Sequence, residues 1–363
     1  MSWGEKLNRE TLLKILDLAR WAPSGDNTQP WRFRIISDSE VIVIGSDTQS
    51  WCLYDLNGWA SQMAHGALLE TIRIAASGLG VLANWELLSI STDSGECLYK
   101  VLFKNATAIE KDSLFPFIEQ RTVQRRVMFT TPLTAAERTA LVDAVGKEFE
   151  IKFFSDLSDR LAIGRLLWLS AYIRLTCPEA YRVHSEIIEW RARYSRDRIP
   201  EQAVGVDRVT ARLMQWVLQD WHRVEFFNKY LLGTVLPRIQ LDFLPALFCA
   251  SHVLLLPRGQ LIEWGDYVNL GRAMQRLWLT ATSLGLHLQP QMTPVIFRWY
   301  ARTSRTLSVR TVLNQNLLSV AERLESLAEV ERDSPAGFFC RIGKSDVPSS
   351  RSLRKELAEL LVE

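Results

Sequence analysis

The decapeptide Ala22-Pro-Ser-Gly-Asp-Asn-Thr-Gln-Pro-Trp31 decides how this chain of 363 residues is interpreted. It follows residues 10–21, where apolar side chains recur at helical spacing, and its Pro, Gly, Asp and Asn end that helix. A loop of this composition offers backbone N–H groups and short polar side chains in a confined space. Asn27 can both donate and accept hydrogen bonds, which suits the edge of a planar heterocycle. The same residues would also make an ordinary turn between a helix and a strand, and composition alone favours that simpler interpretation.

Composition limits the kinds of protein that this chain can be. Apolar residues make up 47% and charged residues 23%, as in ordinary globular proteins, and the length allows two domains or one large duplicated domain. The net charge is +2 with acids and bases interspersed, so no basic stripe indicates a nucleic-acid partner. The most apolar stretch, residues 241–257, is interrupted by Asp242, Pro245 and His252 and is too short to cross a bilayer. We therefore expect neither a nucleic-acid nor a membrane partner.

The cysteines and histidines are too dispersed to indicate a metal site or disulfides. Five Cys, at positions 52, 97, 177, 249 and 340, form no Cys-x-x-Cys pair, and the five His are equally scattered. Cys249 and His252 share an apolar run and are more simply explained as packed core. Glu5 and Lys6 stand where a secretion signal would need apolar residues. We expect reduced thiols, no metal and a cytoplasmic location.

Apolar periodicity and turn residues predict a mixture of helices and strands. Helices are expected at residues 10–21, 59–78, 112–126 and 265–284, with mainly helical sequence over 134–235. Strands are expected at residues 31–36, 41–44, 84–92, 97–104, 252–256, 292–298 and 337–342.

One internal similarity indicates a duplication. Residues 65–80 resemble residues 270–285, and Gly271 follows Gly66 by 205 residues, as Gly285 follows Gly80. Both segments are typical of helices rich in small residues that stop at a glycine, which adopts the left-handed conformation cheaply. Two unrelated buried helices with a common stop signal would look similar. We adopt the duplicated half-domain, because self-similarity at a long period is what a duplication predicts.

Residues 22–31 match the Ala-Pro-Ser-x-x-Asn-x-Gln-Pro-Trp signature of the nitroreductase family at every defined position, so the chain resembles that family. The resemblance implies an α+β, nitroreductase-like fold in which FMN lies at the interface of two subunits. It also implies that the decapeptide forms part of the flavin site, with Pro23, Ser24 and Asn27 as flavin contacts.

A second family signature, an arginine-rich opening, normally precedes that loop but here follows it. The run from Arg121 through Arg125 to Phe129 resembles the signature, although Val123 replaces the expected Ser and Phe129 falls late. Guanidinium groups bind phosphate bidentately and stay charged, so Arg121 and Arg125 are the expected cradle for the FMN phosphate and ribityl chain. The C-terminal segment resembles the family's final strand and basic segment, which makes Arg351 a further phosphate ligand. The alternatives are a solvated basic helix end at Arg121 and Arg125, and a solvated start of a C-terminal helix at Arg351.

The displaced arginines imply two complementary halves. In homodimeric relatives one subunit supplies the arginines and the other the loop; here residues 1–115 keep the loop and residues 116–363 keep the arginines. We expect tandem duplicated halves that form an intramolecular pseudo-dimer, with one FMN per chain and a helical insertion at about 155–245. Within that insertion, Glu189-Trp190 and Asp197-Arg-Ile-Pro200 resemble a branch of single-chain, two-lobed relatives, some of which hold FMN beneath a lid.

The segment after the second repeated helix corresponds to a loop that the family places beside the reactive face of the flavin. A backbone N–H there would hydrogen-bond flavin N5 and stabilise the reduced form. The expected flavin-binding residues of this segment are Gln289, Pro290 and Gln291. An ordinary turn between a helix and a strand explains the same residues.

These observations predict an FMN-dependent oxidoreductase that transfers hydride or electrons between NADH or NADPH and a small organic acceptor. The first alternative is an FMN-sequestering or storage protein with little turnover. Its lid, if these residues are not plain core, would contain Trp216, Trp221, Phe226, Phe227 and Tyr230. The second is a tailoring dehydrogenase of a peptide or natural product, in which Lys229 and Tyr230 would be catalytic. The sequence leaves open the substrate, the nicotinamide, and whether the chain is a monomeric pseudo-dimer or a homodimer.

Overall fold

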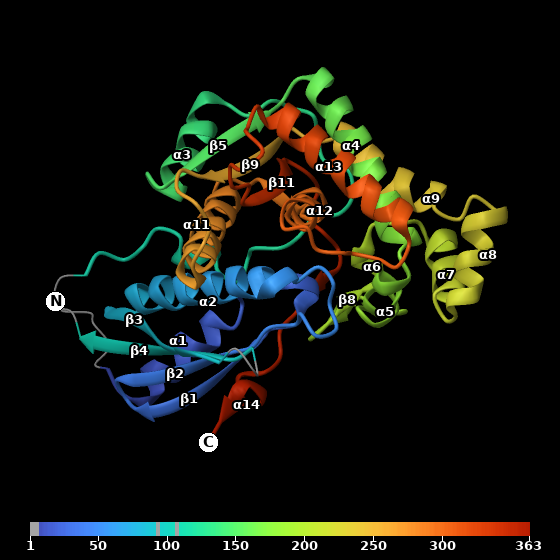
Figure 1. The fold of residues 1–363 in the computed structure, drawn as a ribbon. Helices are drawn as coiled ribbons and strands as arrows, with labels where there is room; N and C mark the ends of the chain where they lie inside the picture. Colours follow the sequence, from blue (N-terminus) through green and yellow to red (C-terminus); the bar gives the residue numbers. More distant parts are fainter. Residues whose placement is uncertain (1–6, 92–94, 106–108) are drawn as a thin grey trace.

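The N-terminal third of the chain folds around one sheet (Figure 1). The computed structural model describes residues 7–91, 95–105 and 109–363, so Glu5 and Lys6 lie outside the described residues. Four consecutive strands form antiparallel pairs in the order β1-β2-β4-β3: β1 (Trp31–Ser37), β2 (Glu40–Gly45), β3 (Val81–Ile90) and β4 (Cys97–Asn105). Two helices pack on this sheet: α1 (Arg9–Ala19) and α2 (Trp59–Gly78). Leu12 of α1, Phe33 of β1 and Leu68 of α2 are fully buried in one apolar core.

A second antiparallel sheet follows with the order β5-β9-β11-β10. Its strands are β5 (Phe149–Phe154), β9 (Ser251–Pro257), β10 (His287–Pro290) and β11 (Phe338–Gly343). Helix α3 (Ala135–Val145) precedes β5, and helix α11 (Trp264–Ser283) connects β9 to β10. In chain order, α3, β5, β9, α11, β10 and β11 therefore repeat the arrangement of α1, β1, β2, α2, β3 and β4.

Most other helices lie between strands of the second sheet. Those between β5 and β9 are α4 (Leu157–Thr176), α5 (Pro178–Glu186), α6 (Glu201–Val204), α7 (Arg208–Val217), α8 (Trp221–Tyr230), α9 (Val235–Arg238) and α10 (Leu244–Leu247). Those between β10 and β11 are α12 (Thr293–Arg302) and α13 (Thr311–Ala328). Figure 1 shows α7 and α8 at the right-hand edge of the molecule, away from both sheets.

Short elements complete the chain. They are the two-residue strands β6 (Ile188–Glu189), β7 (Tyr194–Ser195), β8 (Ile199–Pro200) and β12 (Arg351–Ser352), followed by α14 (Leu357–Leu360) and β13 (Leu361–Val362). Strand β13 pairs in parallel with β1, with Leu361 opposite Phe33. The end of the chain therefore completes the sheet formed by its beginning.

Helices α2 and α11 meet at a pair of glycines. A Cβ atom on Gly66 would lie 1.9 Å from the carbonyl oxygen of Val268, and one on Gly271 would lie 2.0 Å from that of Met63. The contact is reciprocal: the carbonyl that each glycine meets belongs to the residue three positions before the glycine of the other helix, Val268 before Gly271 and Met63 before Gly66. Only glycine permits this approach of two backbones.

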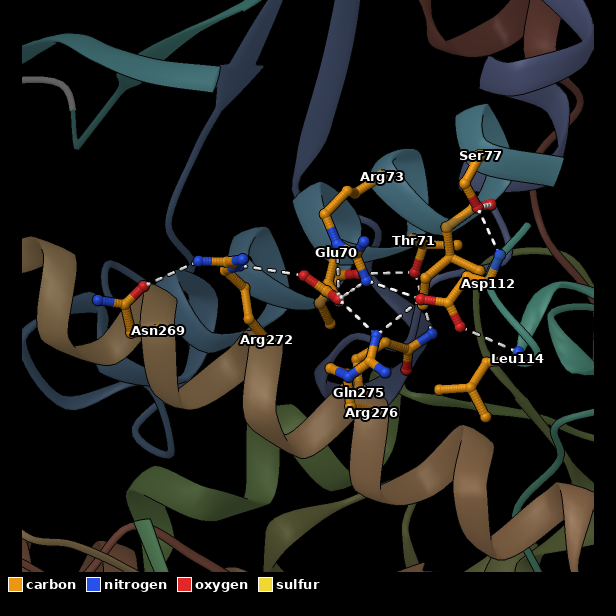
Figure 2. A network of polar contacts seen from close by, with 12 residues as sticks. Glu70, Thr71, Arg73, Ser77, Asp112, Leu114, Asn269, Arg272, Gln275 and Arg276 are labelled. Atoms are coloured by element: carbon orange, nitrogen blue, oxygen red, sulfur yellow. Dashed lines mark hydrogen bonds and ion pairs between the residues drawn. The ribbon is translucent and has the colours of Figure 1, made fainter. Parts of the chain in front are cut away.

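A buried ionic cluster joins the same two helices (Figure 2). The Glu70 side chain is 2% exposed and accepts hydrogen bonds from three guanidinium groups: Arg73, Arg272 and Arg276. Arg73 and Arg276 also donate to Asp112. Burial alone would raise the pKa of the Glu70 carboxyl, but the three arginines together hold it below its usual value.

Three sequence expectations differ from the structure. Residues 112–126 are not one helix: they contain only the short 3-10 turn Phe115–Phe117, and Val123 forms a β-bridge with Leu288. Residues 293–302 form helix α12 instead of a strand at 292–298, with Pro294 in the first turn, where a missing N–H costs nothing. Residues 149–154 form strand β5 within a region expected to be helical. Residue 92 of the expected strand 84–92 lies outside the described residues.

Candidate functional site

A cavity of about 630 Å³ lies where distant parts of the chain meet. Its wall contains the loop of residues 23–30, the arginine run and the segment of residues 289–293. Side chains of the inserted helices, together with Ser352 and Arg354 of the C-terminal segment, line other parts of the wall. The volume is typical of small-molecule and cofactor sites.

The loop after α1 is held in an unusual backbone conformation. Asn27 and Gln29 have φ angles of 66° and 51°, a left-handed region that few residues other than glycine adopt. The Ser24 hydroxyl accepts a hydrogen bond from the Gln29 N–H. The fully buried Gln29 amide donates to the Arg196 carbonyl and accepts from the Lys355 N–H. Gln29 thus ties the loop to both the insertion and the C-terminal segment, while Pro23 and Ser24 line the cavity.

Asn27 lines the cavity and carries an unsatisfied hydrogen-bond acceptor. Its side chain is 6% exposed, and Nδ2 donates to the Arg198 carbonyl at 3.2 Å. The Oδ1 atom is buried and has no hydrogen-bond partner among the described residues. Leaving such a group unpaired costs about 1–3 kcal/mol, so a ligand with an N–H donor would be stabilised here.

Arg121 and Arg354 form a buried cationic end of the cavity. Arg121 stacks over the Trp278 ring at 4.5 Å and donates to the Trp21 carbonyl, but its Nε has no partner. Burial, followed by the charges of Arg354 and Arg351, lowers the pKa of Arg121 well below its usual value. Burial and neighbouring arginines also lower the pKa of Arg354 to about 9. Within the described residues neither guanidinium has an ion-paired carboxylate. A phosphate group would supply the missing negative charge.

Arg351, the expected phosphate ligand of the C-terminal segment, lies outside the cavity wall. It donates to the Glu119 carbonyl at 2.9 Å and stacks over the Trp21 ring. Arg354 lines the cavity instead and donates to the Ala22 carbonyl. The two arginines belong to the same basic segment, and only the path of the backbone distinguishes them.

Arg125 lines the cavity, but the nearby Asp26 carboxylate partly compensates its positive charge. Burial lowers the pKa of Arg125, and the Asp26 carboxylate opposes that shift. Burial likewise raises the pKa of Asp26 against the charges of Arg125 and Arg174. Arg125 is therefore partly compensated within the protein, unlike Arg121.

The segment of residues 289–291 reaches the cavity, but both of its side-chain amide oxygens and the Gln291 N–H already have partners. Gln289 Oε1 accepts from Arg341 Nε at 2.6 Å, and Gln291 Oε1 lies 2.8 Å from His252 Nδ1. The Gln291 N–H donates to the Phe339 carbonyl, so it is not free to contact a ligand as the sequence led us to expect. Helix α12 begins at the next turn without a side-chain cap, and Met292 and Thr293 line the cavity. The first-turn N–H groups of a helix have no intrahelical acceptor, which makes them the better donors.

Helix α8 turns only some of its expected residues toward the cavity. Val224, Phe227 and Asn228 line it at helical spacing. Lys229 and Tyr230 do not line it; they lie on another face, where Lys229 Nζ stacks over the Tyr230 ring and Tyr230 is 62% exposed. Of the five aromatic residues that the sequence suggested as a lid, the two that line the cavity are Trp221 and Phe227.

A tyrosine–histidine pair in the cavity wall had no sequence signal. Tyr54 lies between β2 and α2, and its hydroxyl is 2.8 Å from Nε2 of His184 in helix α5. Burial raises the pKa of Tyr54 well above its usual value. Burial, followed by the charge of Arg174, lowers the pKa of His184 to about 3. The imidazole is therefore neutral, and Nε2 can accept a hydrogen bond from the Tyr54 hydroxyl. Because 130 residues separate the pair, no local motif could have indicated it.

Residues 7–91, 95–105 and 109–363 contain neither a candidate group of metal ligands nor a candidate membrane-spanning helix. No group of three His, Cys, Asp or Glu residues there could hold a metal ion. None of the helices in those ranges is both long and apolar enough to cross a membrane. The five cysteines are buried and unpaired.

Comparison with known proteins matches part of the chain to one family. A family model described as the nitroreductase family matches residues 4–136, which include the loop and the arginine run. No curated protein matches the chain.

Several solved structures are similar to most of the chain at low sequence identity. A nitroreductase-like family protein from Bacillus cereus is 11% identical over 70% of this chain and 98% of its own, with a TM-score of 0.35. The FMN-dependent nitroreductase NfnB from Mycobacterium smegmatis, in complex with NADPH, is 14% identical over 68% and 96%, with a TM-score of 0.36. The FMN and NADPH-dependent NfnB from Sphigopyxis sp. strain HMH is 12% identical over 69% and 98%, with a TM-score of 0.39.

Proposed function

We propose that this protein is an FMN-binding oxidoreductase that moves hydride or electrons between NADH or NADPH and a small organic acceptor. The observation that carries the proposal is the shape and charge of one cavity. An unpaired acceptor, Asn27 Oδ1, and an uncompensated cationic end, Arg121 with Arg354, belong to the same wall. The nitroreductase family match over residues 4–136 supports the same cofactor.

The residues of the wall fit the parts of FMN. Asn27 Oδ1 would accept from a ring N–H, Arg121 and Arg354 would hold the phosphate, and the N–H groups at Met292 and Thr293 would face the isoalloxazine edge. When bound, FMN would supply the group that accepts and returns hydride. The protein's own part is to bind and orient. The inserted helices α5, α7 and α8 would exclude water from the cavity.

We further propose that the chain consists of duplicated halves, about 1–115 and 116–363, that form an intramolecular pseudo-dimer with the insertion at about 155–245. The repeated strand order and the reciprocal contacts of Gly66 and Gly271 support this arrangement. The halves differ at the loop: residues 20–30 connect α1 to β1, whereas only residues 146–148 connect α3 to β5. The shorter loop leaves no counterpart of Asn27, so the proposal includes one FMN per chain.

The test begins with the visible spectrum of the purified protein. We expect bound or added FMN at one per chain, and anaerobic NADH or NADPH should bleach it on the timescale of turnover. A colourless protein that takes up no FMN would refute the proposal.

Storage of FMN is the second candidate, because inserted helices contribute much of the cavity wall. A bound flavin that no nicotinamide bleaches would favour it. The tailoring dehydrogenase is not part of the proposal, because Lys229 and Tyr230 do not line the cavity. We also infer a cytoplasmic location, since five buried, unpaired cysteines suit a reducing compartment.

A further inference from the structure

The outer face of helices α7 and α8 exposes many large apolar side chains. Six of them form what we term the α7–α8 face: Leu213 (42% exposed), Trp216 (47%), Phe226 (52%), Tyr230 (62%), Leu231 (55%) and Leu232 (72%). Single exposed apolar residues are normal, but a contiguous patch of them marks a binding surface. Figure 1 shows that these helices project from the body of the molecule.

Ring contacts show that this face is continuous from one helix to the other. The Trp216 ring meets Phe227 at 5.7 Å, Phe227 meets Phe226 at 6.2 Å, and Phe226 meets Tyr230 at 5.2 Å. Leu231 and Leu232 follow Tyr230 directly along the chain. Aromatic contacts therefore connect α7 to α8 through Phe227, which also lines the cavity.

Cations lie among these apolar groups. Arg223 stacks over the Trp216 ring at 4.6 Å, Lys229 stacks over the Tyr230 ring at 5.1 Å, and Arg212 is exposed on the outer side of α7. The acidic residues nearby are engaged elsewhere. Asp207 and Asp220 cap the N-termini of α7 and α8, and Glu225 pairs with Arg310; these are the acids of residues 207–232.

The α7–α8 face also borders the cavity. Leu213, Leu231 and Leu232 both line the cavity and belong to the exposed face, so they form its rim. Inward from the rim the wall continues through Met214, Phe227 and other apolar side chains. An apolar path thus leads from the exposed face into the cavity.

We propose that the α7–α8 face rests on the surface of an anionic phospholipid bilayer, with the cavity rim turned toward the acyl chains. Apolar and aromatic side chains flanked by Arg and Lys are what a helix lying in the membrane interface requires. An apolar molecule dissolved in the lipid would then reach the cavity without crossing water. The proposed contact departs from the prediction of no membrane partner, which was based on the lack of an apolar stretch long enough to cross a bilayer; a contact at the interface needs no such stretch.

A lipid surface suits this face better than a second copy of the chain. A symmetric dimer would place the same patch on both sides of the interface. Arg212, Arg223 and Lys229 would then face one another across it. Anionic headgroups instead complement these cations, and each such residue near the surface strengthens binding about fivefold.

The test is vesicle binding by the full chain, which does not require FMN. Co-sedimentation would compare phosphatidylcholine vesicles with vesicles of phosphatidylcholine and phosphatidylglycerol, at low and high salt. We expect tighter binding to the anionic vesicles and release by high salt. Brominated acyl chains should quench part of the tryptophan fluorescence of the unaltered protein, because Trp216 would enter the interface.

Paired variants separate the contributions of charge and apolar area. The double change Arg212→Gln and Lys229→Gln should weaken vesicle binding about 25-fold. The control is Lys147→Gln with Arg323→Gln, which removes the same number of positive charges outside the α7–α8 face and should not weaken binding. Phe226→Ser with Leu232→Ser should weaken binding about twentyfold.

The matched apolar control is Ile262→Ser with Val347→Ser, which changes side chains that are 80% and 83% exposed on other segments. Absence of vesicle binding, or equal binding by all these variants, would overturn the proposal. The proposal would also be overturned if the protein does not bind vesicles and instead forms a dimer that dissociates when the α7–α8 face is changed.

Discussion

Replacement of Arg121 by Met tests the proposed phosphate site most directly. Met fills a similar volume without charge, so the change removes a buried guanidinium whose Nε has no partner. The Trp21 carbonyl, which accepts from Arg121, keeps a second donor, since Arg354 Nη2 lies 3.4 Å away. The free protein should therefore lose little stability.

Binding and stability should respond in different directions. A charged hydrogen bond to phosphate contributes about 1.5–3 kcal/mol, so the Kd for FMN should rise roughly 10- to 150-fold in Arg121→Met. Burial and like charges disfavour the charged Arg121 in the free protein, so its unfolding free energy should stay within about 1 kcal/mol of the unaltered value or rise.

Three measurements check this reasoning. Fluorescence titration of FMN gives the Kd, urea unfolding gives the stability of the free protein, and thermal unfolding with inorganic phosphate isolates the anion site. Phosphate should raise the Tm of the unaltered protein more than that of Arg121→Met. The exposed Arg165 on α4, changed to Met, is the control. Equal Kd values and equal phosphate shifts for both variants would show that the phosphate binds elsewhere.

Three further variants probe the helix crossing, the ionic cluster and the loop. Gly271→Ala should lower the free energy of unfolding in urea by about 2–4 kcal/mol, because the added Cβ lies 2.0 Å from a facing carbonyl oxygen. The control is Gly265→Ala in the same helix, where no atom lies within 4 Å of the added Cβ and the change should be neutral or stabilising. Equal losses of stability in the two variants would contradict the close helix crossing. Glu70→Gln should cost about 3–5 kcal/mol at pH 7. The pKa of Glu70 in the folded protein lies below its usual 4.5, so its ion pairs stabilise the protein above pH 4.5 and this stabilisation is lost as the pH falls below that value. The free energy of unfolding of Glu70→Gln should therefore depend less on pH below 4.5 than that of the unaltered protein. The same pH dependence in both proteins would argue against the ion pairs. Asn27→Gly should weaken FMN binding about fivefold in titrations yet change the stability of the free protein by less than about 1 kcal/mol, because glycine adopts the positive φ of this position and the lost bond to Arg198 is offset by removal of an unpaired oxygen. An unchanged Kd would remove Asn27 from the site.

The sequence predicted the two repeated helices, α2 and α11, because their signals are local. Helix α2 was expected at residues 59–78 and ends at Gly78, where small residues and a glycine stop coincide. Strand β5 was missed although residues 149–153 alternate between apolar and polar, because it is only six residues long and lies within a long region of mainly helical sequence. Helix α12 was missed because Val295 and Ile296 favour strands, whereas their packing in the second core outweighs that preference.

The cavity wall could be predicted only in part. The residues of the decapeptide stand together in the sequence, so one motif located them. Tyr54 and His184 come from segments that meet only in the folded chain, and no spacing rule connects them. The choice of Arg354 over Arg351 depends on the path of the C-terminal backbone.

The pairing of β13 with β1 affects the order in which the chain can fold during synthesis. Leu361 lies beside Phe33, and the Lys355 N–H holds Gln29 in the loop that contains Asn27. During synthesis, a ribosome that has already released the first sheet still retains the strand that completes it. We therefore expect the loop to take its final shape only after residues 355–362 have left the ribosome, long after the strands of the first sheet.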